Sequence, residues 1–569
     1  MATRGPLLLL LLLAVALGGA GAMRELGRRH AVGARHPRLP RAAPAAAPPR
    51  RATPGVANCT LHWIEQTIDH FSWAATPTGA TTYSQRYFTY DAFWDRAGNG
   101  SIWLYAGNEA DVTLYVEHTG LMWEHAASAG ALLIFAEHRF YGPSLPCGDA
   151  WPQCVRYLTH EQAQADYAAL ALHIQSSYGV TQPVVLFGGS YGGKLAAWTR
   201  IKYPGVFAGA VAASAPVLAF QGMTPAYDSA SYWAVVTRDA TPAGGAAAAC
   251  AANIRAGWEP LFAAFSSPAG RAQLADSLRL CSPPPADGSF DVAMFLLNAW
   301  DTLAMGSFPY ASNYLTGGGD APDLPPWPMR AACEFLATPG LAGWELLAAM
   351  GASAGVFNNA TADVACYEPA TGQNVWEDGI WDYQWCTQLL PEETFFTRKG
   401  GVSDMFWPFT FNNSQVAAHC AAAWGVVPRF EWIATAYGVG GPHGSLLGGS
   451  NIVFSNGAYD PWSSGGVVNA TQAGAARVRG AGAAPDAALA AAEAAASAAG
   501  VTVRSTAAGI TTVWIADGAH HIDLFFSNAG DTPSITAARG VELALVSAWT
   551  SAWYAARAAD VGGAAAAEL

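Results

Sequence analysis

The chain has 569 residues, of which 52% are hydrophobic and only 12% are charged, and its net charge is −13. This apolar content excludes a disordered or fibrous protein, and the acidic balance without a basic stripe gives no support to nucleic-acid binding. The length exceeds one simple core, so we expect two domains or one domain with a large insertion.

The amino-terminal segment has the pattern of a secretory signal peptide. Arg4 precedes the apolar run 7–17, and small residues follow as far as Ala22. This run is shorter than the roughly 20 residues of a membrane span, which favours removal of residues 1–22 over a retained anchor. Residues 23–57 are rich in Arg, Pro and Ala and are expected to form a disordered leader or propeptide. No transmembrane helix is expected in the mature protein.

Cysteines and glycosylation sequons also suit the secretory pathway. The chain has nine cysteines, disulfides persist in that pathway, and an odd number leaves at least one thiol unpaired within the chain. Cys147 and Cys154 are close enough in sequence to pair with each other. No cysteine has the spacing of a metal site. The candidate glycosylation sites are Asn58, Asn99, Asn359, Asn412 and Asn469.

Strands alternate with helices in the first part of the expected core, residues 58–219. The predicted strands lie at 101–107, 131–137, 183–187 and 206–213, and the predicted helices at 161–178 and 192–203. This alternation predicts an α/β fold with a mostly parallel sheet and helices on both faces.

Residues 220–445 lose this alternation. They contain many tryptophans, most of the cysteines and apolar stretches of helical length. We therefore expect an inserted, mainly helical domain between two parts of the sheet.

The second part of the core is expected at 446–556. Strands are predicted at 451–455 and 511–516, and a last helix at 534–555. Residues 472–500 are mostly Ala and Gly without an apolar stripe, so we expect an exposed low-complexity insertion there. The similar residues 557–569 are expected to be a disordered tail.

A candidate nucleophile lies in the motif Gly-Gly-Ser-Tyr-Gly at 188–192. The motif falls between a predicted strand and a predicted helix, which is the context of a G-x-S-x-G nucleophile turn. Side chains at 188 or 192 would collide with the neighbouring strand or helix. The turn would raise Ser190 Oγ above the sheet and point the Tyr191 N–H at a developing oxyanion. The alternative is a glycine-rich turn with an incidental serine.

A serine nucleophile needs a base and an acid that orients the base. Asp460 follows the strand 451–455, and His520 and His521 follow the strand 511–516, in the order Ser, Asp, His of α/β hydrolases. Active-site groups of such sheets gather at the carboxyl ends of strands. These residues are therefore predicted to form a catalytic triad, with one of the two histidines as the base.

Two other carboxylates, Asp517 and Asp523, lie on the same loop as the histidines and rank below Asp460. A turn-forming role for Asp460 and surface positions for the histidines are the alternatives, which the order and placement of the three groups disfavour. A triad requires neither a metal nor an organic cofactor, so none is expected.

Six motifs, taken together, resemble the family of lysosomal Pro-Xaa carboxypeptidase and dipeptidyl peptidase II. They occur in the family's order between residues 59 and 556, interrupted by 472–500. The motifs are Gly-Asn-Glu-Ala-Asp (107–111), Ala-Glu-His-Arg-Phe-Tyr-Gly (136–142), Gly-Gly-Ser-Tyr-Gly-Gly (188–193), Trp-Asp-Tyr-Gln-Trp-Cys-Thr (381–387), Ser-Asn-Gly-Ala-Tyr-Asp-Pro-Trp (455–462) and Gly-Ala-His-His-Ile-Asp-Leu (518–524).

The resemblance implies an α/β-hydrolase core with an inserted helical cap, and cleavage next to proline near a peptide end. It places Ser190 as nucleophile, Asp460 as orienting acid and His520 as base. It implies a second oxyanion donor in the turn that contains Asn108, in addition to the Tyr191 N–H. It also implies lysosomal, vacuolar or extracellular delivery.

The substrate pocket is expected beside these groups. The resemblance implies that Trp462 lines an apolar pocket for a proline ring, with Glu109 and Lys194 in or beside family motifs. Lys194 stands where many members have Met, and Phe525 stands where many have Arg. Lys194 could alter specificity, and loss of the Arg could change the pH range of the base.

Disulfides are implied by the same resemblance. The implied pairs are Cys250–Cys333, Cys281–Cys366 and Cys386–Cys420, which together with a local Cys147–Cys154 pair leave Cys59 unpaired.

A Pro-Xaa carboxypeptidase is preferred, because segments 309–315 and 324–329 resemble that branch. The alternative is a dipeptidyl peptidase II-like enzyme, which the motif starting at Trp381 resembles. Remoter alternatives are a secreted lipase or esterase and a non-catalytic binding protein on a hydrolase fold. The expected partners are proline-containing peptides. A homodimer stays open, and neither nucleic acid nor, after signal removal, membrane is expected to bind.

Overall fold

The computed structural model describes residues 53–224, 226–369, 380–389, 404–409, 413–437, 449–468, 487–506 and 509–567, with side chains as far as residue 558. The predicted signal peptide and most of the predicted leader lie outside the described residues. A search of the described residues found no helix with the length and apolar character of a membrane span.

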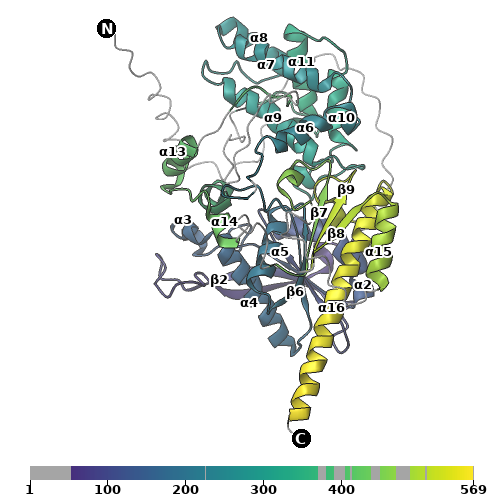
Figure 1. The fold of residues 1–569 in the computed structure, drawn as a ribbon. Coiled ribbons are helices and arrows are strands. Elements are labelled where there is room, and N and C mark those ends of the chain that lie inside the picture. The colour runs from purple at the N-terminus through teal and green to yellow at the C-terminus, as the bar shows by residue number, and fades with distance from the viewer. Residues whose placement is uncertain are drawn as a thin grey trace.

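One sheet forms the centre of the base of the molecule (Figure 1). The six strands β4, β3, β5, β6, β7 and β9 run parallel, whereas β1, β2 and β8 pair antiparallel with their neighbours. This is the arrangement of an α/β hydrolase. In spatial order the strands are β1 (Thr60–Thr67), β2 (Thr82–Tyr90), β4 (Leu132–Ala136), β3 (Ile102–Ala106), β5 (Val184–Gly189), β6 (Phe207–Ala213), β7 (Ile452–Gly457), β9 (Ile510–Ile515) and β8 (Thr502–Ser505).

Helices bury both faces of this sheet. One face packs against α4 (His160–Tyr178) and α5 (Tyr191–Lys202). The other packs against α1 (Val112–His118), α2 (Gly120–Ala129) and α16 (Pro533–Ala567). Because both faces are covered, every residue of β3 to β7 is buried, and such strands are continuous apolar runs in the sequence.

Three strands, β1, β2 and β8, lie outside the set predicted from the sequence. β1 and β8 are the edge strands of the sheet, and no residue of β8 is fully buried. Their residues mix polar and apolar side chains, because one side of each strand meets solvent, and this weakens the apolar signal.

The described residues between β6 and β7 are mainly helical, and the sequence predicts a helical insertion there at 220–445. We call the group α6–α11 the cap; Figure 1 shows it above the end of the sheet where β7 and β9 terminate. The helices of this region are α6 (Ser231–Asp239), α7 (Cys250–Ala264), α8 (Pro268–Leu278), α9 (Ser289–Met305), α10 (Pro328–Cys333), α11 (Gly343–Asn358), α12 (Ile380–Gln384), α13 (Asn413–Trp424) and α14 (Trp432–Tyr437).

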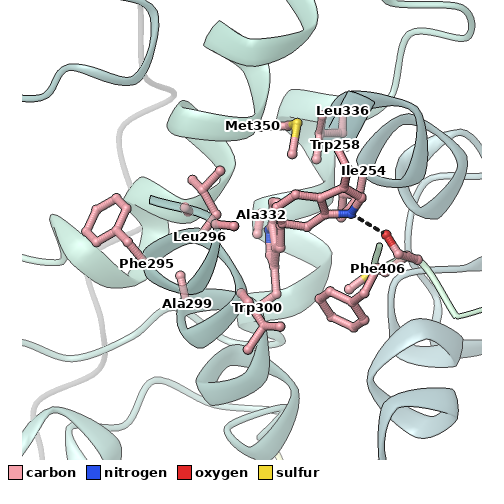
Figure 2. Packing of buried hydrophobic residues seen from close by; sticks show 14 of the residues in the cluster. Ile254, Trp258, Phe295, Leu296, Ala299, Trp300, Ala332, Leu336, Met350 and Phe406 are labelled. Atoms are coloured by element: carbon pink, nitrogen blue, oxygen red, sulfur yellow. Dashed lines mark hydrogen bonds between the residues drawn. The ribbon is translucent and has the colours of Figure 1, made fainter. Parts of the chain in front are cut away.

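The cap has an apolar core of its own, separate from the two clusters that flank the sheet. Trp258 and Trp300 lie at its centre with ring centroids 5.9 Å apart, surrounded by aliphatic and aromatic side chains (Figure 2). The indole N–H of Trp258 donates to the Met405 carbonyl at 2.7 Å, and that of Trp300 donates to Ser353 Oγ at 2.9 Å. Both buried donors are thus satisfied, as a stable interior requires.

Four disulfides are formed, and they join the pairs named in the sequence analysis. Two lie in the cap, one joins η7 (Trp385–Leu389) to α13, and one closes the loop around α3 (Trp151–Cys154). Cys59 is a free thiol. The pairs are Cys147–Cys154, Cys250–Cys333, Cys281–Cys366 and Cys386–Cys420.

Two expectations about alanine-rich segments are wrong. Within 472–500, helix α15 (Ala487–Ala498) packs on α16 with Leu489 and Ala496 buried, although the sequence suggested no docking stripe. The segment 557–569 is not a disordered tail as far as Ala567, because α16 continues to that residue, in keeping with the high helix propensity of alanine.

Candidate active site

Ser190 occupies a tight turn between β5 and α5. Its backbone has φ +58° and ψ −126°, a conformation that residues other than glycine rarely adopt. A side-chain carbon at position 188 would lie 2.1 Å from the Gly192 carbonyl oxygen, and one at 192 would lie 2.9 Å from the Ala106 carbonyl oxygen. The glycines are therefore required by close backbone approach, as the motif predicts, and the turn holds Ser190 at the end of the sheet.

Tyr191 begins α5, so its backbone N–H is among the amides that have no acceptor within the helix. The phenol is buried, with His138 Nε2 3.0 Å from its oxygen and the Gln384 amide donating to it at 2.5 Å. These contacts fix the residue that follows the serine. An anion forming at Ser190 would meet the positive end of the helix dipole.

Asp460 lies three residues beyond β7 and caps the short helix η8 (Pro461–Gly465). Its carboxylate is completely buried and accepts the Trp462 N–H at 3.0 Å. The same oxygen, Oδ1, lies 2.9 Å from His520 Nδ1. That contact is short, but it does not meet the geometry of a hydrogen bond.

His520 follows β9 and is 3% exposed. Its backbone N–H donates to the Met305 carbonyl at 3.3 Å, so the last turn of the cap helix α9 holds the loop that carries the ring. With Nδ1 turned to Asp460, Nε2 is the ring atom left to accept a proton from a hydroxyl.

The three turns lie at the same end of the sheet because the strands that precede them, β5, β7 and β9, run parallel, with β6 between β5 and β7. Backbone hydrogen bonds also join the turns at this end. They run from Ser190 N–H to the Ala213 carbonyl, from Ser214 N–H to the Ser455 carbonyl, and from Tyr459 N–H to the Gly518 carbonyl.

The His521 ring lies beside the His520 ring, with centroids 4.5 Å apart, and over Gly189, where an added side-chain carbon would lie 2.8 Å from it. The His521 ring packs edge-on against Tyr314 and Phe525, with centroids 5.0 and 5.1 Å away. Neither ring nitrogen has a hydrogen-bond partner among the described residues, and burial lowers the pKa of His521 well below its usual value. A neutral ring in an aromatic pocket is not placed to act as the base. Phe525, one of the departures from the family pattern, forms part of this pocket.

The two lower-ranked carboxylates are occupied elsewhere. Asp523 accepts the Ser455 hydroxyl at 2.6 Å, and Asp517 accepts the hydroxyl of Ser534. Among the described residues, the carboxylate at His520 is that of Asp460.

Asn108, Glu109 and Lys194 lie together beside the nucleophile turn. The buried Asn108 amide donates to Glu109 Oε2 at 2.8 Å. Burial raises the pKa of Glu109, whereas the Asn108 hydrogen bond and the charges of Lys194 and His520 lower it. Lys194 is 7% exposed, with Nζ 5.8 Å from the centre of the Tyr191 ring.

Trp462 is partly buried and links the part of the molecule that contains the sheet to the cap. Its indole N–H donates to Met305 Sδ at 3.1 Å, and its ring meets Tyr232 of α6 edge-on at 4.8 Å. The cap thus forms part of the wall of the site.

Sequence reasoning missed a carboxylate in this wall. Asp301 of α9 accepts the Tyr232 hydroxyl at 2.6 Å. Burial raises the pKa of Asp301 to about 7; the Tyr232 hydrogen bond lowers it, the Asp460 charge raises it and the His520 charge lowers it. No sequence signal identifies this residue, because its helix has no motif and its place depends on how the cap docks.

Other predicted positions lie apart from the site. Asn58 and Asn99 are exposed, Asn359 is partly buried, and Asn412 and Asn469 lie outside the described residues. Asp382, Cys386 and His419 are the one group of three potential metal ligands found in the described part of the chain, but Cys386 is engaged in a disulfide.

Comparison with known proteins places the chain among serine peptidases. Residues 66–494 match the family described as serine carboxypeptidase S28. Lysosomal Pro-X carboxypeptidase of Homo sapiens is 34% identical over 558 residues, which cover 97% of this chain and 98% of the human protein. The Mus musculus protein of the same name is 34% identical, covering 86% and 89% of the two chains. Thymus-specific serine protease of Mus musculus is 30% identical, covering 70% and 76%. The chain belongs to the serine carboxypeptidase S28 family and is a serine peptidase with an α/β-hydrolase fold.

Proposed function

We propose that this protein is a Pro-Xaa carboxypeptidase, which removes the last residue of peptides that carry proline before it. Ser190 is the nucleophile, His520 the base and Asp460 the orienting acid. The observation that carries this assignment is the 2.9 Å contact of His520 Nδ1 with the buried Asp460 carboxylate, at the sheet edge where Ser190 stands on its turn. Relatives that share a third of the sequence are named Pro-X carboxypeptidases, which supports the substrate class.

Acyl-enzyme chemistry follows from these three groups. His520 Nε2 takes the proton of the Ser190 hydroxyl as its oxygen attacks the carbonyl carbon of proline. The Asp460 carboxylate holds the imidazole in the required tautomer and stabilises the imidazolium that forms. The Tyr191 N–H and a donor from the Asn108 turn stabilise the oxyanion. His520 then protonates the departing amine, and water releases the acyl group by the reverse sequence.

The substrate pocket is proposed between the cap and the end of the sheet. Trp462 offers an apolar wall suited to a proline ring, and Glu109 and Lys194 lie beside the nucleophile turn. Residues 220–445, which include the cap, are proposed as one inserted domain that would restrict the site to peptide ends.

A dipeptidyl peptidase II-like activity is the second candidate. Among the described residues, the carboxyl groups of Glu109 and Asp301 are close enough to His520 for its charge to act on them. Carboxylates suit the ammonium group of a peptide amino terminus better than a terminal carboxylate. This observation favours an aminodipeptidase, whereas the names of the relatives favour a carboxypeptidase.

Two blocked peptides distinguish these activities. One has a blocked amino terminus and ends in Pro-Phe; the other begins with a free Lys-Pro or Lys-Ala and has a blocked carboxyl terminus. Release of Phe from the first peptide alone is expected, and Ser190→Ala must abolish it. Release of a dipeptide from the second alone would replace the carboxypeptidase assignment. If neither is cut while Ser190 reacts with a fluorophosphonate, the triad stands and the proline specificity is wrong.

The protein enters the secretory pathway, where its four disulfides persist. We propose the lysosome, a vacuole or the extracellular space as its place of action. Asn58 and Asn99 are exposed and therefore accessible to glycosylation.

A further inference from the structure

Asp301 lies in the part of the cap that meets the catalytic groups. It is one helical turn before Met305 on α9, so the two side chains lie on the same face. Met305 contacts the catalytic edge twice, through its carbonyl at the His520 N–H and through Sδ at the Trp462 indole. This face of α9 therefore points at the site proposed for substrate.

The Asp301 carboxylate forms one wall with Trp462 through Tyr232. Tyr232 is 3% exposed, donates its hydroxyl to Asp301 Oδ1 at 2.6 Å, and packs its ring edge-on against Trp462 at 4.8 Å. Asp301 itself is partly buried. If Trp462 holds the proline ring, Asp301 borders the acyl side of the scissile bond.

Asp301 has no cationic partner among the described residues. Asp239 of α6, by contrast, has one, because Arg238 Nη2 lies 2.6 Å from Asp239 Oδ1. The charged groups that act on Asp301 are instead those of the triad, Asp460 and His520. A partly desolvated carboxylate beside a second carboxylate is unfavourable unless a cation neutralises it.

We propose that Asp301 recognises a positively charged nitrogen on the acyl side of the substrate, making this a peptidase that prefers cationic peptides. The inference rests on the proposed function and names the substrate class of the same site. The nitrogen has two sources: the ammonium of a basic side chain before proline, or the free amino terminus of a very short peptide. Either one would pair with Asp301 Oδ2 while Oδ1 keeps the Tyr232 hydrogen bond.

A purely structural role is the competing explanation, in which Asp301 only anchors Tyr232. Two variants separate the explanations. Asp301→Asn removes the charge but keeps an oxygen that accepts the Tyr232 hydroxyl. Tyr232→Phe removes that hydrogen bond but keeps the charge. If the preference for cationic substrates is lost in Asp301→Asn but kept in Tyr232→Phe, Asp301 recognises the substrate by its charge. If it is lost in Tyr232→Phe, the hydrogen bond and the structure of the cap are responsible.

The test measures kcat/KM ratios of paired substrates with the full-length wild type and both variants at a pH above about 7, where the Asp301 carboxyl is ionised. Acetyl-Lys-Pro-Phe is compared with acetyl-norleucine-Pro-Phe, which tests the side chain. Free Ala-Pro-Phe is compared with acetyl-Ala-Pro-Phe, which tests the amino terminus. We expect the wild type to prefer the cationic member of at least one pair by about tenfold or more, as for close charge pairs in interfaces. The ratio should fall toward one in Asp301→Asn and remain in Tyr232→Phe.

Equal rates within both pairs in the wild type, or an unchanged ratio in Asp301→Asn, would overturn the inference and leave the triad intact. If no Pro-Phe peptide is cut, the carboxypeptidase assignment fails. The same acyl groups are then offered as p-nitrophenyl esters, which an active Ser190 cleaves whatever the leaving residue. A cationic preference that Asp301→Asn removes would still support recognition, and equal ester rates would refute it.

Discussion

Glu542, on α16 behind the catalytic loops, is buried with both carboxyl oxygens lacking a hydrogen-bond partner among the described residues. Its side chain lies beside those of Asp523 and Ser455, and Ser455 already donates its hydroxyl to Asp523 at 2.6 Å. Two adjacent carboxyl groups with one hydroxyl between them are satisfied only if one of them holds a proton. Burial, followed by the Asp523 charge, raises the pKa of Glu542 well above its usual value.

The effect of this proton on stability has a definite sign. An acid whose pKa is raised by folding binds its proton more tightly in the folded state, so its contribution is complete below the unfolded pKa of 4.5 and is lost as the pH rises toward the folded pKa. Over that window the free energy of unfolding falls by about 1.4 kcal/mol per pH unit.

Glu542→Gln isolates this contribution, because glutamine keeps a donor for Asp523 at every pH and carries no charge. Urea unfolding of wild type and variant, followed by tryptophan fluorescence at several pH values, measures the difference. As the pH rises from 4.5, the free energy of unfolding of the variant should increase relative to that of the wild type by about 1.4 kcal/mol per pH unit. Glu345→Gln, an exposed carboxylate on α11, is the control and should not change the slope. Parallel pH profiles for wild type and Glu542→Gln would refute the shared proton.

Three further outcomes are expected. Asp460→Asn should lower kcat by about 10⁴-fold with little change in melting temperature, since the amide can still accept the Trp462 N–H; a loss under tenfold in steady-state assays would remove Asp460 from the triad. Leu489→Ala should destabilise the protein by about 2–5 kcal/mol in chemical unfolding, because this side chain is buried between α15 and α16; no change would mean that α15 is undocked. The Lys over norleucine preference should grow as the pH rises through about 7, where Asp301 ionises beside Tyr232, Asp460 and His520. A preference that is flat across that range in kcat/KM would contradict the role of its charge.

Burial on two sides explains why the central sheet could be predicted. β3 to β7 and β9 correspond to apolar runs that end at glycines or polar turns, and the strands predicted there agree within a few residues. β1 and β2 gave no such run, because their polar side chains alternate with buried ones on strands that partly face solvent. Helix α15 was wrongly predicted to be exposed for a related reason: a helix made mostly of alanine has no pattern that distinguishes a buried face from an exposed one.

Some residues of the candidate site could likewise be predicted from the sequence, whereas others could not. Ser190, Asp460 and His520 could be named because each follows a recognisable strand, and the glycines at 188 and 192 are required by close backbone contacts. Asp301, Tyr232 and Met305 could not, since they lie on helices whose sequence specifies an apolar face but not the partner that the face meets. Which histidine of the pair faces the acid also depends on the loop, which turns His521 into an aromatic pocket.

The bond from the His520 N–H to the Met305 carbonyl makes the cap a component of the catalytic apparatus rather than a cover for it. A rigid outward swing of α9 would remove the acceptor that holds the histidine loop and would withdraw the sulfur that contacts Trp462. Under the proposed function, a cap that stays in place during turnover would leave peptides to enter beside it. An enzyme entered in this way would spare folded proteins and process only free, narrow chain ends, so its selectivity for small peptides would be a mechanical property of how the cap is fastened.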